Sequence, residues 1–277
     1  MTLEGGVTEV VPAAERSGAV SSAPERETGT VRRVLLLLGT LADHPGESAQ
    51  RLAGRLNLPR STVHRLLTML RANGFADVEP DGSFGPGLEL LRIAGRVGAR
   101  MPYRKLAEPY LQALTAQFHE TTILSLLARS QLKMFYAAMG SPPDPMRYNF
   151  ELGALQPLIW GATARTILAH MCEDEIVKAL ARRELSPARR MKVDEAELRD
   201  ALAHIRRDGY GISHGHRTAT AVGIAAPFFD GEGRVVGSLA FLIPEFRWAS
   251  APRQRIIEAL MNAAQELSRR LGHVESP

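Results

Sequence analysis

The chain has 277 residues, of which 45% are hydrophobic, and this is enough to bury the core of one large domain or of two ordinary ones. A net charge of +4 excludes a polybasic protein, and a single cysteine, Cys172, excludes an internal disulfide framework. No apolar run is long enough to span a bilayer, and the N-terminus lacks the apolar stretch of a secretory signal. We therefore expect a soluble, cytoplasmic protein.

The charge is unevenly distributed along the chain. Residues 1–29 carry a net charge of −3, whereas residues 30–100 contain ten arginines, no lysine and six acidic residues, a net charge of +4. Residues 101–277 carry only +3 over a much longer stretch. Positive charge is therefore densest in residues 30–100, which is typical of a segment that binds nucleic acid.

Residues 1–28 are rich in Gly, Ser, Ala, Pro and Glu without any periodicity, and we predict a disordered tail there. A first helix is expected to begin at Thr30. Ser48 is placed to cap a short second helix, and a third helix is predicted from Pro59 to Asn73-Gly74, which favour a C-terminal cap. Two short, closely joined amphipathic helices are typical of a helix-turn-helix.

The third helix places apolar and polar residues on opposite faces. Its apolar stripe, at spacing i, i+3, i+4, i+7, consists of Val63, Leu66, Leu67 and Leu70. The opposite face carries no carboxylate, so it can enter a DNA major groove, where arginine reads guanine or phosphate. The alternative is an ordinary amphipathic surface helix. The residues that we predict to contact DNA are Arg60, Ser61, Thr62, His64, Arg65, Thr68, Arg51 and Arg33.

A hairpin is predicted directly after the third helix. Phe75 and Val78 alternate with polar residues, Pro80-Asp81-Gly82 is a turn sequence, and the chain returns through Phe84. A helix-turn-helix followed by a hairpin indicates a winged helix. The groups expected near DNA phosphates are the wing at 81–83 and the side chains of Arg32, Arg33, Arg51 and Arg55.

The rest of the chain is predicted to form a second domain. Residues 87–99 are expected to form a fourth helix, and 102–118 a fifth one that links the two domains. Strands are predicted at 121–128, 133–140, 146–150, 210–213, 223–229 and 234–243. Further helices are predicted at 161–171, at 174–183, from 193 and from 252. Strands interleaved with helices indicate an α+β sheet domain.

The chain resembles the IclR family of bacterial transcriptional regulators from about Thr30 to Gly272. The stretches that carry the resemblance are LPRSTVHRLLTMLRANGF at 58–75, HIRRDGYGIS at 204–213 and GIAAPFFDGEGRVVGSLAF at 223–241. The resemblance implies a tail (1–28), a winged helix-turn-helix DNA-binding domain (29–100), a linker helix (101–119) and a GAF-like effector-binding domain (120–273). It also implies a homodimer or homotetramer on a pseudo-palindromic operator. We expect no cofactor.

The sequence departs from the family pattern around the expected effector pocket. Trp160 stands near the pocket mouth, Ala164 replaces the family's usual glycine, and residues 213–217 lack the usual acidic side chains. Ala240 and Leu242 stand where some relatives that bind small keto acids place serines. The pocket is therefore expected to be more apolar than theirs, and we predict that it binds a bulky, aromatic carboxylate.

The residues predicted to bind this effector are Trp160, Gly161, Ala162, Thr163, Ser213, His214, His216, Gly223, Ala240, Phe241 and Leu242. Trp160 and Phe241 would supply an apolar wall, and Thr163 and the two histidines the polar groups. An alternative for Trp160 is an aromatic residue of the core or of an interface. The alternative for the histidines is an exposed loop.

Other functions lack a motif in this sequence. His214-Gly215-His216 is not a zinc pattern, because no cysteine or repeated carboxylate accompanies the imidazoles. There is no nucleophile elbow and no Walker loop, so we do not expect an enzyme. Two alternatives to a DNA-binding regulator remain: a metabolite sensor that acts through protein contacts, and an enzyme on a GAF-like scaffold.

Overall fold

The computed structural model describes residues 23–98, 102–143, 148 and 150–274, with side chains described from residue 29 onward. Of the tail predicted at 1–28, residues 1–22 lie outside the described residues. The chain divides into two compact units between Ala94 and Gly95, within helix α4 (Leu88–Gly98). Within the part of the chain that is described, no helix is both long enough and apolar enough to cross a membrane.

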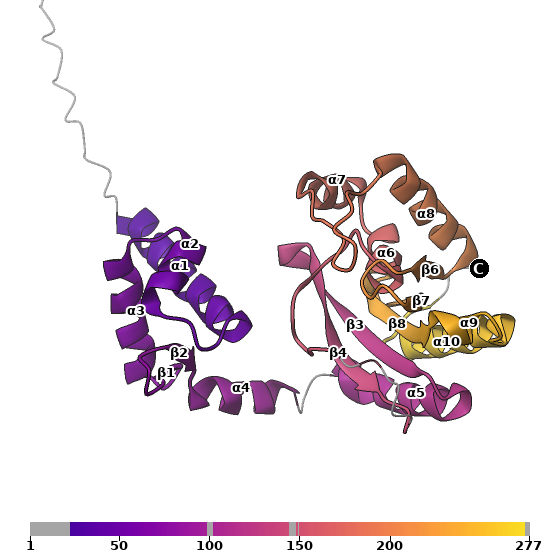
Figure 1. Ribbon diagram of the computed structural model, residues 1–277, viewed down its shortest axis with the longest axis horizontal. Helices are drawn as coiled ribbons and strands as arrows, with labels where there is room; N and C mark the ends of the chain where they lie inside the picture. The colour runs from indigo at the N-terminus through magenta and orange to yellow at the C-terminus, as the bar shows by residue number, and fades with distance from the viewer. Residues whose placement is uncertain (1–22, 99–101, 144–147, 149, 275–277) are drawn as a thin grey trace, which may run out of the picture. The chain divides into compact units, whose positions relative to one another are not determined.

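The N-terminal unit is a helical bundle with a small hairpin (Figure 1). Its elements are α1 (Ala23–Asp43), α2 (Ala49–Leu56), α3 (Arg60–Ala72), β1 (Ala76–Val78) and β2 (Phe84–Pro86). The helices share one apolar core, in which Leu37, Leu52 and Leu67 are fully buried. The predicted stripe of α3 is confirmed, because each of its four apolar residues is buried.

Local capping residues set the helix ends of this unit. The Ser48 hydroxyl accepts a hydrogen bond from the Arg51 amide at 3.4 Å, as expected of an N-cap. Asn57 takes a left-handed conformation (φ 51°) that ends α2 and turns the chain into α3. In the hairpin, β1 and β2 pair antiparallel, and Phe84 also bridges to Glu47 ahead of α2. The predicted helix-turn-helix and hairpin are therefore both present.

The C-terminal unit is built on a six-stranded antiparallel sheet of order β5-β4-β3-β8-β7-β6. The strands are β3 (Thr121–Ala128), β4 (Lys133–Gly140), β5 (Gln156–Pro157), β6 (Gly211–His214), β7 (Ala221–Phe229) and β8 (Val235–Pro244). The helices are α5 (Pro102–Phe118), α6 (Ala162–Ala169), α7 (Glu173–Ala181), α8 (Glu195–Asp208), α9 (Glu245–Trp248) and α10 (Arg253–Arg270), with a 3-10 turn, η1, at Arg129–Gln131.

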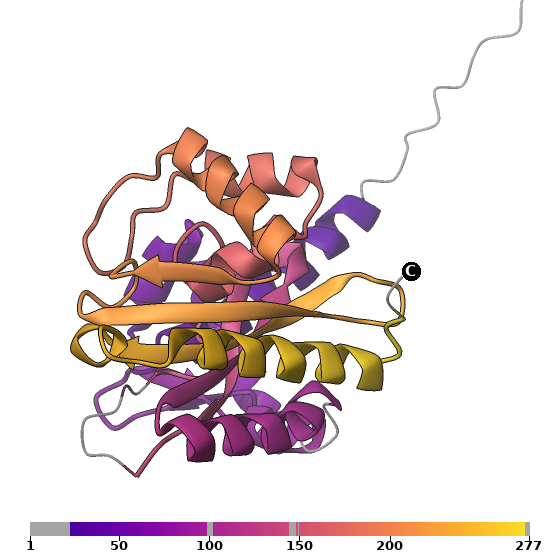
Figure 2. The same ribbon diagram turned by 90° about the vertical axis from the view of Figure 1, so that its right-hand side faces the viewer.

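Helices cover both faces of this sheet, as Figure 2 shows. Alternate residues of a strand point to opposite faces, so each strand supplies two separate cores. Ile123 and Ala240 belong to the core under α6, α7 and α8, whereas Leu124 and Phe241 belong to the core under α5 and α10. The unit therefore has three layers, with helices on either side of a largely buried sheet.

Helix α1 begins at Ala23, so the prediction that the first helix begins at Thr30 was wrong. Residues 23–28 contain Ala, Glu and Arg, which favour a helix, and Pro24 stands in the first turn, where proline is tolerated. Gly29 lies within the helix as well, because one glycine there costs only about 1 kcal/mol.

The strand predicted at 146–150 is not found. Tyr148 and Phe150 are not in a strand, while residues 146, 147 and 149 lie outside the described part of the chain. Instead the two-residue strand β5 forms the edge of the sheet next to β4. Pro157 cannot donate a ladder hydrogen bond, which restricts it to such an edge position.

Helix α5, expected as a linker between domains, lies in the core of the C-terminal unit. Ala107, Leu111 and Leu114 of this helix are buried against the sheet. By contrast, α4 buries none of its residues, and Leu88, Leu91 and Val97 are 77%, 69% and 55% exposed. The division between the compact units therefore falls in α4 and not at α5.

We expect Leu67→Ala to destabilise the N-terminal unit by about 2–5 kcal/mol, because it removes a fully buried side chain from α3. The matched control is Met69→Ala on the same helix, since Met69 is 49% exposed. Hydrogen exchange of residues 60–72 in the full chain measures the effect. Equal loss of protection in the two variants would contradict the packing of α3.

Candidate functional site

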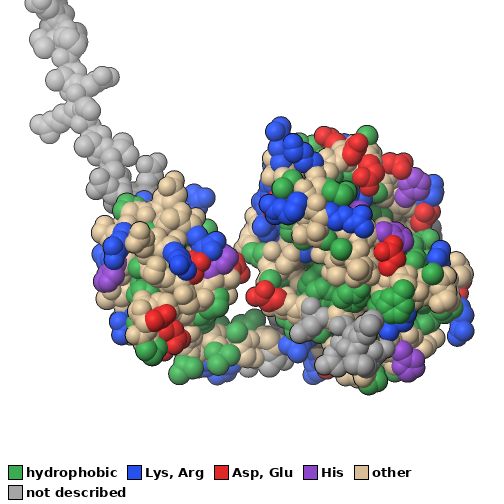
Figure 3. Space-filling model, viewed as in Figure 1, with side chains coloured by type: hydrophobic (Ala, Val, Ile, Leu, Met, Phe, Trp, Pro, Cys, Tyr) green, Lys and Arg blue, Asp and Glu red, His purple; other side chains and the backbone are tan. Residues whose placement is uncertain are grey.

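The polar face of α3 consists of Arg60, Ser61, His64, Arg65 and Thr68. Together with Met69, these side chains line a shallow, open groove. Burial of the apolar stripe turns these side chains outward, and all six are exposed. The Thr68 hydroxyl donates to the backbone oxygen of His64 at 2.9 Å. Basic side chains are visible along the side of the N-terminal unit where α3 lies (Figure 3).

The arginines of this face have no acidic partner. Among the described residues, neither Arg60 nor Arg65 takes part in a salt bridge. Arg55, expected near phosphates, instead makes two hydrogen bonds to the Glu47 carboxylate, at 2.7 and 2.8 Å. The Arg55 guanidinium holds the pKa of Glu47 below its usual value. Arg55 of α2 is therefore held by a carboxylate, whereas Arg60 and Arg65 on the polar face of α3 are not.

The other residues predicted to contact DNA lie at varied positions in the N-terminal unit. Thr62 is half-buried and does not line the groove, so it is less accessible than predicted. Arg51 on α2 and Arg33 on α1 are exposed. Asp81 in the wing accepts a hydrogen bond from the Ser83 amide at 2.9 Å, which fixes the hairpin turn.

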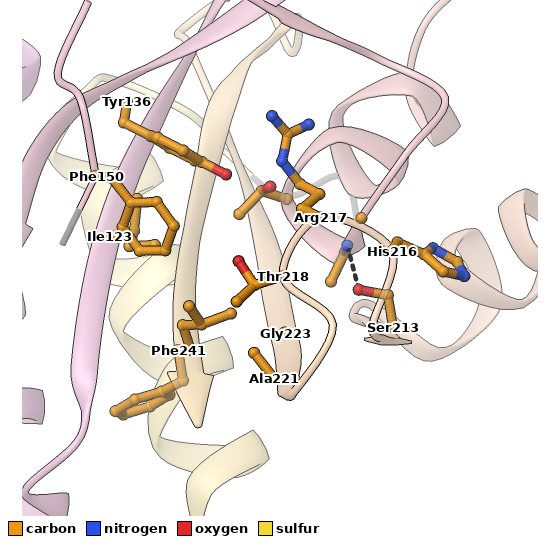
Figure 4. Close-up of a pocket in the computed structure, with 14 residues that line it drawn as sticks. Ile123, Tyr136, Phe150, Ser213, His216, Arg217, Thr218, Ala221, Gly223 and Phe241 are labelled. Carbon is orange, nitrogen blue, oxygen red and sulfur yellow. Dashed lines mark hydrogen bonds between the residues drawn. The ribbon is translucent and has the colours of Figure 1, made fainter. Parts of the chain in front are cut away.

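A second candidate site lies in the C-terminal unit, where the first turn of α6 meets the sheet (Figure 4). This α6 pocket has a free volume of about 30 Å³, close to the space of one water molecule. Its lining comes from strands and from the loop between β6 and β7. The lining residues are Ile123, Tyr136, Phe150, Gly161, Ala162, Thr163, Ser213, His216, Arg217, Thr218, Ala221, Gly223, Phe241 and Leu242.

Most of the residues predicted for an effector pocket meet here. Those that line the α6 pocket are Gly161, Ala162, Thr163, Ser213, His216, Gly223, Phe241 and Leu242. Trp160, His214 and Ala240 do not line it. His214 is exposed, and its Nδ1 lies 3.8 Å from a Glu245 oxygen. Ala240 is buried in the core under α6.

The apolar wall differs from the expected one. Trp160 is 1% exposed, and its Nε1 donates to the Glu184 carbonyl at 2.8 Å, so it is a core residue. The Phe241 ring points away from the pocket and packs edge-on against Phe118, with ring centroids 5.5 Å apart. Aromatic surface is supplied instead by Tyr136 and Phe150, whose centroids are 5.1 Å apart.

Arg217 is the charged residue that the sequence analysis missed. Its guanidinium donates to the Trp160 carbonyl at 3.3 Å and to Oε1 of Gln156, and it lies 5.7 Å from the centroid of the Tyr136 ring. No carboxylate of the described chain pairs with it. Gly161 (φ 84°) makes this position accessible, because a Cβ there would lie 2.5 Å from Cδ of Arg217.

Two polar groups complete the α6 pocket. The Ser213 hydroxyl accepts a hydrogen bond from the Ala162 amide at 2.8 Å, which ties β6 to the first turn of α6 (Figure 4). His216 packs edge-on against Trp160 at 5.5 Å, and its Nδ1 is buried without a partner. Burial, assisted by the charge of Arg165, lowers the pKa of His216 to about 4, so the imidazole is neutral at pH 7.

The α6 pocket therefore suits an organic anion better than a metal ion. It combines two aromatic rings, one guanidinium without an acidic partner and the N-terminus of a helix, where the helix dipole favours negative charge. Within the described part of the chain, no group of three or more His, Cys, Asp or Glu side chains is arranged to hold a metal.

Both units match known protein families. Residues 96–269 match the family described as "Bacterial transcriptional regulator IclR C-terminal", and residues 30–80 match the family described as "IclR helix-turn-helix domain". The transcriptional regulator KipR of Bacillus subtilis is 25% identical over 250 residues, covering 90% of this chain and 99% of KipR. The matched families and KipR are transcriptional regulators and not enzymes, in agreement with the expectation that the chain is not an enzyme.

Solved structures show the same fold. An IclR transcriptional regulator from Silicibacter sp. TM1040 superposes with a TM-score of 0.80 at 27% identity, covering 90% of this chain and 98% of the other. An IclR homologue from Microbacterium hydrocarbonoxydans, complexed with 4-hydroxybenzoate, has a TM-score of 0.70 at 24% identity, covering 87% and 98%. The predicted α+β class, with a helix-turn-helix ahead of a sheet domain, is confirmed.

Proposed function

Since the chain belongs to the IclR family of bacterial transcriptional regulators, with a DNA-binding helix-turn-helix and an effector domain, we propose that it reads a pseudo-palindromic operator as a dimer and responds to an aromatic carboxylate. The observation that carries the DNA-binding part is the polar face of α3. It presents Arg60 and Arg65 without acidic partners, together with hydroxyl groups that can reach base edges.

Arg217 is the observation that favours a carboxylate effector. A guanidinium that bonds only neutral oxygens can take a carboxylate in a bidentate, charge-assisted pair. The first turn of α6 faces the same space, and Tyr136 and Phe150 offer ring surface to an aromatic group. The complex of the Microbacterium hydrocarbonoxydans homologue with 4-hydroxybenzoate supports this choice, because that protein shares the fold.

Binding of a monocyclic acid requires a rearrangement of the pocket. About 30 Å³ of free volume is too small for a benzoate, and the Arg217 side chain fills the space above Gly161. If the Arg217 guanidinium exchanged its hydrogen bond to Gln156 for one to the ligand carboxylate, the pocket would open and the guanidinium would stay bonded. The ligand would thus select a different position of the loop between β6 and β7.

Exposed apolar residues on α4 support the proposed dimer. Leu88 and Leu91 are three residues apart and 77% and 69% exposed, a pattern typical of a surface that packs on another chain. A second copy is the occupant that a palindromic operator requires, because two α3 helices must then be held at a fixed spacing.

We expect Arg65→Ala to weaken binding to the selected operator by about 1–3 kcal/mol if Arg65 contacts guanine. The operator is first selected from random duplexes, and affinities are then measured on this sequence and on a scrambled one at several salt concentrations. Arg71→Ala, which removes an exposed charge from the last turn of α3, is the matched control. Equal losses on the two duplexes would show that Arg65 contacts only phosphate.

We expect 4-hydroxybenzoate to bind the protein and to change its tryptophan fluorescence saturably. Arg217→Ala should weaken this binding about 10- to 100-fold, because it removes a charge-assisted pair. Both tryptophans, Trp160 and Trp248, lie in the C-terminal unit. Arg182→Ala on the exposed end of α7 is the control. A response to glyoxylate or pyruvate alone would refute the aromatic ligand and leave the DNA-binding assignment intact.

We expect the double substitution of Leu88 and Leu91 by Ser to shift the protein towards monomers in sedimentation velocity, because it removes the apolar surface of the proposed interface. Leu152→Ser, at a site that is 47% exposed in the C-terminal unit, is the control. An unchanged sedimentation coefficient at all concentrations would place the interface elsewhere.

A further inference from the structure

We propose that a second cavity of the C-terminal unit binds a small neutral molecule with one flat ring and one hydroxyl group, of which phenol is the simplest example. This His170 cavity lies between the end of α6, the last part of β7, α10 and the segment after α10. Its lining residues are His170, Gly209, Ala226, Pro227, Phe229, Met261, Ala264, Gln265, Ser268 and His273.

The size of the His170 cavity fits a single six-membered ring. Its volume is about 140 Å³. A protein cavity of roughly 150 Å³ is large enough to hold one benzene ring. A single ring therefore fills the inner part of the cavity, and a larger ligand would extend into solvent past the exposed Gln265.

Ring and sulfur groups surround the His170 cavity. His170 and Phe229 meet edge-on with centroids 5.1 Å apart, and Phe229 lies 5.2 Å from His273 at an interplanar angle of 31°. The methyl end of Met261 closes the cavity near Gly209, since a Cβ on that glycine would lie 2.9 Å from it. A flat ring can add favourable aromatic and sulfur–aromatic contacts to this arrangement.

One buried nitrogen in this lining lacks a hydrogen bond. Nε2 of His170 has no partner, although a buried polar group left unbonded costs about 1–3 kcal/mol. The Ser268 hydroxyl is already used, because it accepts from the Phe229 amide at 3.0 Å and donates to the Ala264 carbonyl at 2.8 Å. A ligand hydroxyl both donates and accepts, so it satisfies Nε2 in either tautomer.

The charge of the site favours a neutral ligand over an acid. Burial, with a smaller contribution from Arg206, lowers the pKa of His170 to about 4, so the imidazole is uncharged at pH 7. No Asp, Glu, Lys or Arg side chain lines the cavity. A carboxylate would therefore find no counter-charge in the lining, whereas a neutral hydroxyl needs none.

The His170 cavity is separate from the α6 pocket. The cavity contacts β7 at Ala226 and Pro227, whereas the pocket contacts it at Ala221 and Gly223. Both sites touch α6 at its opposite ends, and no residue lines both. The proposed site therefore does not depend on the aromatic effector proposed for the α6 pocket.

The test titrates phenol into the full-length protein labelled with carbon-13 at its methionine methyl groups. The Met261 resonance is assigned with Met261→Leu, and it reports on the His170 cavity alone. We expect a saturable shift of this resonance with phenol and none with benzoate. Absence of a saturable shift with phenol would overturn the proposal.

Two variants test the contacts. Gln265→Trp, on the rim of the cavity, should weaken phenol binding at least tenfold, whereas Gln254→Trp in the exposed first turn of α10 should leave it unchanged.

His170→Phe should weaken phenol binding about five- to tenfold, because it removes one neutral hydrogen bond, and it should leave toluene binding unchanged. Equal phenol binding by the two Trp variants, or unchanged phenol binding by folded His170→Phe, would overturn the proposal.

Discussion

Burial of both faces of one antiparallel sheet is the constraint on which the C-terminal unit depends. Because neighbouring residues of a strand enter different cores, position along the strand decides which ligand site a side chain can reach. Ile123 faces α6 and lines the pocket, while Leu124 is buried under α5 and α10. The same alternation directs the Phe241 ring away from the pocket.

This alternation also sets the contacts by which an effector could act on the rest of the chain. Thr122, next to Ile123, donates to the Leu111 carbonyl at 3.1 Å and bonds the Thr115 hydroxyl at 2.8 Å, both on α5. Strand β3 thus has one face against the α6 pocket and the other hydrogen-bonded to α5. Only three residues, 99–101, separate α5 from α4.

An effector changes operator affinity only if it binds two arrangements of the protein with different affinity. Movement of the Arg217 loop alone would stay local, because the loop is exposed on its outer side. A change that also displaces β3 would move α5 with it, since the two hydrogen bonds from Thr122 to α5 are buried and costly to break. Because α5 is packed against the sheet, it can respond to a displacement of β3 in a way that a free linker helix could not.

The parts of the structure that depend on local sequence could be predicted. The stripe of α3, the Ser48 cap and the hairpin turn follow from spacing and residue type within a few positions. The pocket could be predicted only in part, because Tyr136 reaches it through the pairing of β3 with β4, which is shifted by a bulge at Leu124/Ser125. Neither that bulge nor the path of the Arg217 side chain follows from spacing.

Three of the buried polar atoms left unbonded in the C-terminal unit lie around α6. Nη2 of Arg165, Nε2 of His170 and Nδ1 of His216 are buried without partners, although almost all buried polar groups in folded proteins are bonded. Arg165 and His216 lie towards the first turn of the helix, and His170 caps its end. Only Arg165 belongs to α6 itself, and each unbonded group makes the surroundings of this helix less stable than their packing would allow. A ligand that hydrogen-bonds to one of these atoms removes this destabilisation, and the free energy recovered contributes to its affinity.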